Sequence, residues 1–182
     1  YLSASAVALT TPENLIEYTK WNHVALVRYG NVVKVYVNGL AIGSINHTGS
    51  VGYSAADTTL CRIGGAGGST AGALYMQDFR IYKGVAKYTD TFTCPSTDSS
   101  VIPESPSGLA VSRKFERSLS GSVGFDGSGD KITANSTDFV FGTSDFTIET
   151  TVFKTNTTYG GNDGALIFSQ TDNNAGGRSG VA

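Results

Sequence analysis

Residues 21–28 read WNHVALVR and residues 35–39 read VYVNG, and these two runs decide the fold. An Asn-Gly pair between apolar alternations is the strongest short-range hairpin signal, because a type I′ turn needs a positive φ at both central residues. The apolar alternation on either side of residues 29–31 predicts two β-strands joined by a tight turn at these residues. A second turn at Asn38-Gly39 then leads into a third strand.

The composition supports an all-β protein with many turns. The 182 residues include 23 Gly, 9 Tyr and 9 Phe, and no long helical periodicity is present. Further strands are expected at residues 1–9, 41–46, 58–63, 74–82, 122–125, 131–134, 145–154 and 165–170, with one helical turn at 85–88. The expected core residues are Trp21, Val24, Leu26, Val35, Val37, Phe79, Ile81, Phe125, Phe146 and Ile148, with Trp21 only partly buried.

Charge patterning argues against two classes of partner. The net charge is −2 and no basic run occurs, so neither nucleic acid nor an anionic membrane is an expected partner. No apolar run is long enough to cross a bilayer, so membrane insertion is not expected either.

Several motifs together resemble one family. The hairpin is followed by ALYMQDFRIYKGVAKY at residues 73–88, then by VGFDGSGD at 123–130 and FGTSDFTIE at 141–149. These motifs are similar to the strands of the laminin-G-like, concanavalin-A-like jelly roll, in the version common in phage tail and virion proteins. The resemblance implies an all-β, two-sheet antiparallel sandwich. It does not select a function, because this fold hosts lectins, glycosidases and inert spacers.

The two halves of the resemblance stand in reversed order. Residues 1–95 resemble the C-terminal half of the jelly roll, residues 121–182 resemble its N-terminal half, and 96–120 reads as a Pro- and Ser-rich linker. Two explanations fit: a permuted domain, or an excerpt that spans two neighbours in a tandem array. The absence of an initial methionine favours the excerpt.

Half a jelly roll is not expected to fold alone, because it leaves an apolar sheet face bare and strand edges unpaired. The halves are therefore expected to pack on each other or on neighbouring copies. In particular, the strand around Phe125 should lie beside the strand around Phe79.

No cofactor is expected to be required, but the resemblance implies that a structural Ca²⁺ can be held. Asp78 and Asp126 fall on strands that are neighbours in the family, and Asp130 is close in sequence to Asp126. Calcium prefers six to eight hard oxygen ligands, often from loops. The alternative is that Asp126 and Asp130 only build Asx turns.

Glycan binding is the expected ligand chemistry, because sugars stack on aromatic rings and hydrogen-bond to polar loops. The candidate residues share a position in or beside a loop: Tyr53, Asp57, Tyr159, Asn162, Asp163, Asp172, Asn173 and Arg178. The alternative is that they are ordinary solvated turn residues.

The sequence argues against catalysis. A glycosidase needs two carboxyl groups facing one sugar, whereas Glu149 stands alone on its strand and Asp145 is expected to form a turn. His23 lacks ligand partners at zinc spacing and is expected to be structural. Cys61 and Cys94 form a disulfide if the protein is extracellular, or stay as thiols if it assembles in a reducing cytoplasm.

These observations favour a non-enzymatic module of a virion appendage such as a tail fibre, which binds host-surface glycan. The alternatives are a purely structural or assembly domain that contacts other copies or flanking domains, and, disfavoured, a glycoside hydrolase. The expected location is the virion, with an extracellular or cell-surface location as the alternative.

Overall fold

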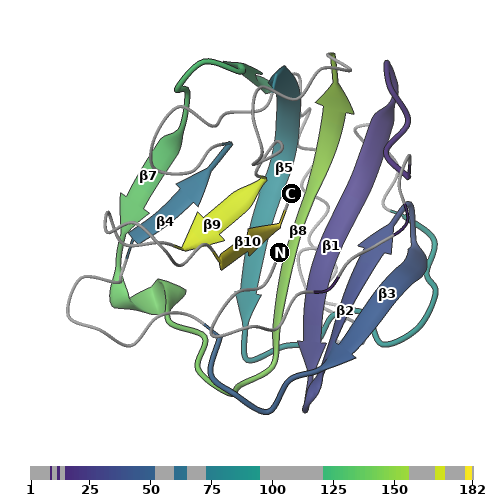
Figure 1. The fold of residues 1–182 in the computed structure, drawn as a ribbon, viewed down its shortest axis with the longest axis vertical. Helices are drawn as coiled ribbons and strands as arrows, with labels where there is room; N and C mark the ends of the chain where they lie inside the picture. The colour runs from purple at the N-terminus through teal and green to yellow at the C-terminus, as the bar shows by residue number, and fades with distance from the viewer. Residues whose placement is uncertain are drawn as a thin grey trace, which may run out of the picture.

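The computed structural model describes residues 9, 12, 15–51, 60–64, 73–94, 121–155, 167–170 and 179–181. These residues form an all-β sandwich of two antiparallel sheets, consistent with the expected jelly roll (Figure 1). No helix in the described part of the chain is long and apolar enough to cross a membrane.

The larger sheet has six strands in the order β3-β2-β1-β8-β5-β6. Their bounds are Leu40–Asn46, Val32–Val37, Trp21–Tyr29, Phe146–Lys154, Ala73–Lys83 and Val123–Asp126. The smaller sheet has four strands in the order β10-β9-β4-β7. Their bounds are Ser179–Val181, Phe168–Gln170, Leu60–Ile63 and Ile132–Asn135. A 3₁₀ helix, η1, spans Thr137–Phe139.

The predicted hairpins are confirmed. β1 pairs with β2 around the turn at Gly30, and β2 pairs with β3 around Asn38-Gly39. Asn38 has φ 50° and Gly39 has φ 82°, which is the pair of positive values that a type I′ turn needs. The segment 85–88 contains no helical turn, which corrects that expectation, because it instead lies against the large sheet.

Both sheets contain strands from both halves of the chain, with a strand of one half inserted between strands of the other. β8 lies between β1 and β5, and β4 lies between β7 and β9 (Figure 1). The expected pairing of the Phe125 strand with the Phe79 strand is confirmed within this chain, since β6 pairs with β5 and Phe125 lies opposite Leu74.

The core fills the space between the sheets in two neighbouring clusters. One contains Leu26, Val33, Cys61, Phe141, Phe146, Ile148 and Phe168; the other contains Val24, Leu74, Met76, Phe125, Val152 and Ile167. Most of the expected core residues are therefore confirmed, and Val35, Phe79 and Ile81 pack against the first cluster while only partly buried. Trp21 is 36% exposed and belongs to neither cluster.

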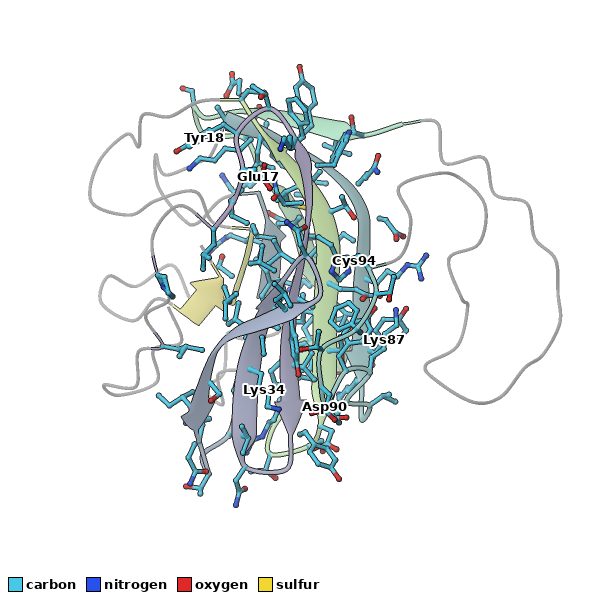
Figure 2. All side chains as sticks on the ribbon, turned by 90° about the vertical axis from the view of Figure 1, so that its right-hand side faces the viewer. Glu17, Tyr18, Lys34, Lys87, Asp90 and Cys94 are labelled. Atoms are coloured by element: carbon cyan, nitrogen blue, oxygen red, sulfur yellow. The ribbon has the colours of Figure 1, made fainter. Side chains whose placement is uncertain are left out.

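The opposite face of the large sheet, here called the outer face, is also partly buried. Residues 85–94, here called the covering segment, lie across it, and Figure 2 shows Lys87, Asp90 and Cys94 on the side away from the yellow strands β9 and β10. Tyr88 and Phe92 of this segment pack on Ala25, Val27 and Tyr36. As a result β1 is buried on both faces along most of its length.

Candidate functional site

The expected glycan-binding residues lie outside the described residues. This holds for the whole set: Tyr53, Asp57, Tyr159, Asn162, Asp163, Asp172, Asn173 and Arg178. The glycan-binding role of these loops stays a prediction.

The three expected calcium ligands do not form one site. β6 places Asp126 opposite Ala73, five residues before Asp78 on β5, which is roughly 16 Å at the usual rise of a strand. Asp78 instead pairs with Arg80, whose Nε lies 2.7 Å from Asp78 Oδ1. Calcium binding by Asp78 together with Asp126 therefore does not fit this arrangement.

Asp126 and Asp130 share one tight turn. The backbone N–H of Ser128 donates to Asp126 Oδ1 at 2.6 Å, and that of Asp126 donates to Asp130 Oδ2 at 3.1 Å. Among the residues the structure describes, no group of three or more histidine, cysteine, aspartate or glutamate side chains could hold a metal ion. These contacts are those of the alternative Asx turns, and calcium binding at this turn stays a prediction.

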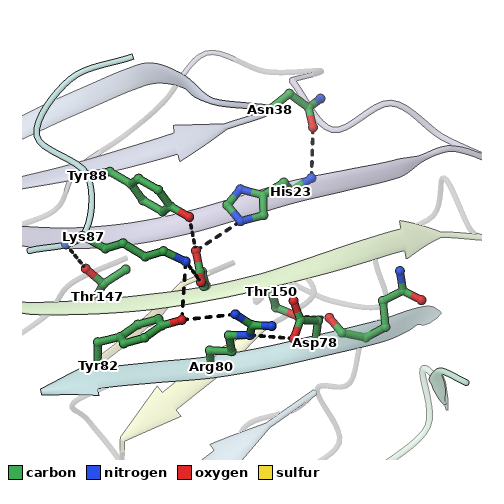
Figure 3. A network of polar contacts seen from close by, with 11 residues as sticks. His23, Asn38, Asp78, Arg80, Tyr82, Lys87, Tyr88, Thr147 and Thr150 are labelled. Atoms are coloured by element: carbon green, nitrogen blue, oxygen red, sulfur yellow. Dashed lines mark hydrogen bonds and ion pairs between the residues drawn. The ribbon is translucent and has the colours of Figure 1, made fainter. Parts of the chain in front are cut away.

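Among the residues that the structure describes, a polar cluster around Glu149 lies on the outer face beneath the covering segment. Figure 3 shows its members His23, Lys87 and Tyr88. Lys87 Nζ donates to Glu149 Oε1 at 2.5 Å, and Tyr88 Oη donates to Oε2 at 2.6 Å. His23 Nε2 lies 3.4 Å from the same Oε2. The side chains of His23, Lys87 and Glu149 are only 7%, 5% and 3% exposed, so the cluster is almost closed to solvent.

Burial alone would raise the pKa of the Glu149 carboxyl. Hydrogen bonds from His23, Lys87 and Tyr88, with the positive charge of Lys87, outweigh burial and lower the pKa to about 2. Burial, reinforced by the Glu149 carboxylate, raises the pKa of the Tyr88 hydroxyl, which therefore keeps its proton. Glu149 is thus a fixed negative charge with its acceptor sites occupied.

A chain of contacts extends this cluster along β5. Lys87 Nζ also lies 3.4 Å from Tyr82 Oη, and Arg80 Nη1 donates to the same oxygen at 3.3 Å. Arg80 in turn forms an ion pair with Asp78 (Figure 3). Asp78 has a φ of 55° and lies where the pairing of β5 with β8 is irregular. The charges of β5, β8 and the covering segment therefore form one continuous network.

Asp145 directly precedes β8, after the turn residue Thr143 and the bend at Ser144. Its Oδ1 accepts the backbone N–H of Gly30 at 2.7 Å, and its carbonyl accepts that of Gly84. Glu149 and Asp145 therefore both have structural partners. Lys87 and Tyr88 were missed as partners of Glu149, because they lie 62 and 61 residues from it and no local spacing signals the contact.

The two cysteines carry free thiols, which excludes the disulfide alternative for this structure. Cys61 belongs to the core between the sheets, whereas Cys94 ends the covering segment on the outer face. Burial raises the pKa of the Cys61 thiol to about 12 and also raises that of Cys94, so neither is an activated nucleophile.

Comparison with known proteins agrees with this fold. Residues 2–89, which include β1 to β5, match a laminin-G family model described as the concanavalin A-like lectin/glucanases superfamily. Searches of curated proteins and of solved structures returned no match. The sandwich and this match together define a protein that is similar, over its N-terminal part, to concanavalin A-like lectins and glucanases.

Proposed function

We propose that this chain is a non-enzymatic carbohydrate-binding module of a virion appendage such as a tail fibre. The observation that carries the proposal is the concanavalin A-like match over residues 2–89, joined to a two-sheet sandwich. The virion assignment rests on the sequence resemblance alone, and an extracellular or cell-surface location is its alternative.

Two carboxylates, Glu149 and Asp145, support a role without catalysis. A glycosidase needs two carboxyl groups flanking the scissile bond, one of which must carry a proton. Glu149 is buried, and Asp145 bonds to a backbone N–H. With a pKa near 2, Glu149 is also unsuited to act as a general acid at neutral pH.

A purely structural role is the second candidate. Among the described residues, β3 and β6 form the two edges of the large sheet. Unpaired strand edges are templates for pairing with another chain. In this reading the module joins neighbouring copies or flanking domains of a fibre and binds no ligand.

The proposal is tested by exposing the purified protein to a panel of soluble polysaccharides: hydroxyethylcellulose, laminarin, galactomannan and alginate. Retention on at least one of them, with no release of reducing ends, is the expected result. Binding is expected to be weak for one copy, because many copies on one particle raise the effective concentration.

Two results contradict the proposal. Reducing ends that appear with the wild type and vanish in Glu149→Gln or Asp145→Asn, while the variants stay folded, would make the protein a hydrolase. Absence of retention on the whole panel would favour the structural role, which loss of fibre assembly on deleting the domain would then support.

A further inference from the structure

An aromatic row crosses the outer face beyond the covering segment. Trp21 of β1 lies directly opposite Phe153 of β8, which lies directly opposite Tyr75 of β5. The ring centroids of Trp21 and Phe153 are 5.5 Å apart, and those of Phe153 and Tyr75 are 6.4 Å apart. Residues that pair directly across neighbouring strands point to one face, so these rings form a continuous row.

The row continues onto a fourth strand, where Gly124 of β6 lies opposite Tyr75. A Cβ at Gly124 would come within 2.9 Å of the Tyr75 ring, so the ring lies over a position that has no side chain. Glycine here gives the aromatic ring room to lie across the neighbouring strand.

The two outer rings are open to solvent. Trp21 is 36% exposed and Tyr75 is 46% exposed, while Phe153 between them is half-buried. The covering segment packs on Ala25, Val27 and Tyr36 instead. Contiguous exposed apolar side chains, unlike single scattered ones, are a feature of binding surfaces.

Polar side chains border the row. On the same face, the next positions are His23, Thr151 and Gln77, which lie opposite one another on β1, β8 and β5. The Asp78–Arg80 pair follows on β5, with both side chains 21% exposed. His23 and Thr151 are buried, so the partly exposed Gln77 and the Asp78–Arg80 pair supply the hydrogen-bonding groups beside the rings. The row itself carries no charge.

We propose that this aromatic row is a stacking site for a soluble, neutral glycan chain, an inference that rests on the proposed function. A pyranose ring offers a flat face of C–H groups, which the negative face of an aromatic ring attracts, and a rim of hydroxyls for polar neighbours. The rings of Trp21 and Tyr75 are inclined to that of Phe153 by 60° and 63°. Such a non-planar row fits a twisted single chain better than a flat crystalline surface.

Two other occupants fit less well. A stable protein interface buries on the order of 1,200–2,000 Å², far more than three rings supply. A nucleic acid needs cations along the stacking surface, and the row has none.

Trp21 is the only tryptophan in the chain, so its fluorescence reports binding directly. The wild type is titrated with hydroxyethylcellulose, laminarin and galactomannan, and emission is measured together with retention. A change in emission on binding is expected. Tyr75→Ala and Trp21→Ala should each weaken retention up to about tenfold, the effect of losing one aromatic contact. Trp21→Phe should restore part of it.

Tyr29→Ala is the matched control, because Tyr29 is 61% exposed at the other end of β1 and lies outside the row. It should bind like the wild type, and circular dichroism checks that every variant is folded. Retention that survives in Trp21→Ala and Tyr75→Ala but is lost in Tyr159→Ala or Asp163→Ala would overturn the aromatic row and leave the proposed function standing.

Three further results of the binding assay would each contradict part of the proposal. Binding of alginate alone, which is an anionic polysaccharide, would overturn the assignment of a neutral glycan but would still agree with the proposed carbohydrate-binding function. Equal retention on crystalline cellulose and on soluble chains would overturn the twisted-chain assignment. No binding to any polysaccharide would overturn the row and the proposed function together.

Discussion

Glu149 occupies a strand position where its charge is surrounded by protein, and its neighbours explain why the fold tolerates it. A buried carboxylate is expensive unless it is paired and hydrogen-bonded. Here Lys87, Tyr88 and His23 converge on its two oxygens. The contact that neutralises it also fastens the covering segment to the sheet.

Low pH should destabilise the protein because the Glu149 carboxylate becomes protonated. The pKa of Glu149 is about 2 in the folded state and 4.5 ordinarily, so its stabilising effect is complete above about pH 4.5. That contribution is lost as the pH falls from 4.5 towards 2. In Glu149→Gln the free energy of unfolding should fall less over this range, as measured by urea unfolding at a series of pH values. A parallel pH dependence in the variant and the wild type would contradict this account.

At neutral pH, Glu149→Gln should lower the free energy of unfolding by about 3–5 kcal/mol, because the substitution leaves Lys87 buried without its counter-charge. The double variant Lys87→Met, Glu149→Gln should recover much of that loss. The control is Glu17→Gln, since Glu17 pairs with Lys20 on the surface with both side chains more than half exposed. Its effect should be at most about 1 kcal/mol.

Arg28 shows how one residue can organise loops that are distant in sequence. Its guanidinium is fully buried and donates to the carbonyls of Gly30, His47, Gly49 and Gly142. Buried backbone carbonyls need such partners. The side chain therefore joins the end of β1 to loops from both halves of the chain.

At the scale of elements, the β2–β3 turn and the covering segment depend on each other. The backbone N–H of Phe92 donates to the carbonyl of Gly39 at 3.0 Å. A Cβ on Gly39 would come within 2.0 Å of the Phe92 carbonyl oxygen. The hairpin turn is thus also the docking point of the segment that covers the outer face.

Gly39→Ala should therefore destabilise the protein more than Gly30→Ala, although both glycines have a positive φ. Alanine at Gly30 meets open space and should cost about 1–2 kcal/mol for its left-handed backbone. Alanine at Gly39 adds a steric conflict with backbone. Urea unfolding gives the two free energies, and equal losses would contradict the proposed contact.

A second measurement locates the damage. Cys94 lies at the end of the covering segment, and its sulfur is 3.5 Å from the Cβ position of Gly39. Its thiol should react faster with a thiol reagent in Gly39→Ala than in Gly30→Ala. Cys61 lies in the core and should stay unreactive in both variants.

At the scale of the whole molecule, neither half of the chain completes a sheet. The central strand β8 comes from the second half but lies between β1 and β5 of the first, and β4 lies between β7 and β9. Each half alone would expose apolar faces, with a loss of about 25 cal/mol for each Å² left in water.

Residues 1–95 and 121–182, expressed separately, should therefore each be unfolded, as judged by circular dichroism and by the dispersion of NMR signals. Mixing the two should restore strand structure and cooperative melting. A folded spectrum from residues 1–95 alone would show that the first half closes without β8. A sample of residues 1–95 alone, at the same total concentration as the mixture, serves as the control.

Much of this fold could be predicted from local sequence. The alternation in residues 21–28 and the Asn38-Gly39 pair predicted β1, β2 and their turns, because strand periodicity and turn dihedrals depend only on near neighbours. The pairing of the Phe125 and Phe79 strands came from the family resemblance. The short β10 and η1 were missed, since three residues carry too little pattern.

The contacts at the candidate sites could not be predicted from the sequence, because they join residues that are far apart in the chain. Glu149 looked solitary in sequence, yet Lys87 and Tyr88 reach it from the covering segment. Trp21 was expected to be only partly buried, and it is 36% exposed. That it forms a row with Phe153 opposite it, and with Tyr75 opposite Phe153, was not predicted. The sequence by itself determined which residues become strands and turns, since those preferences are local. Only the tertiary structure decided which strands become neighbours, and therefore which side chains meet.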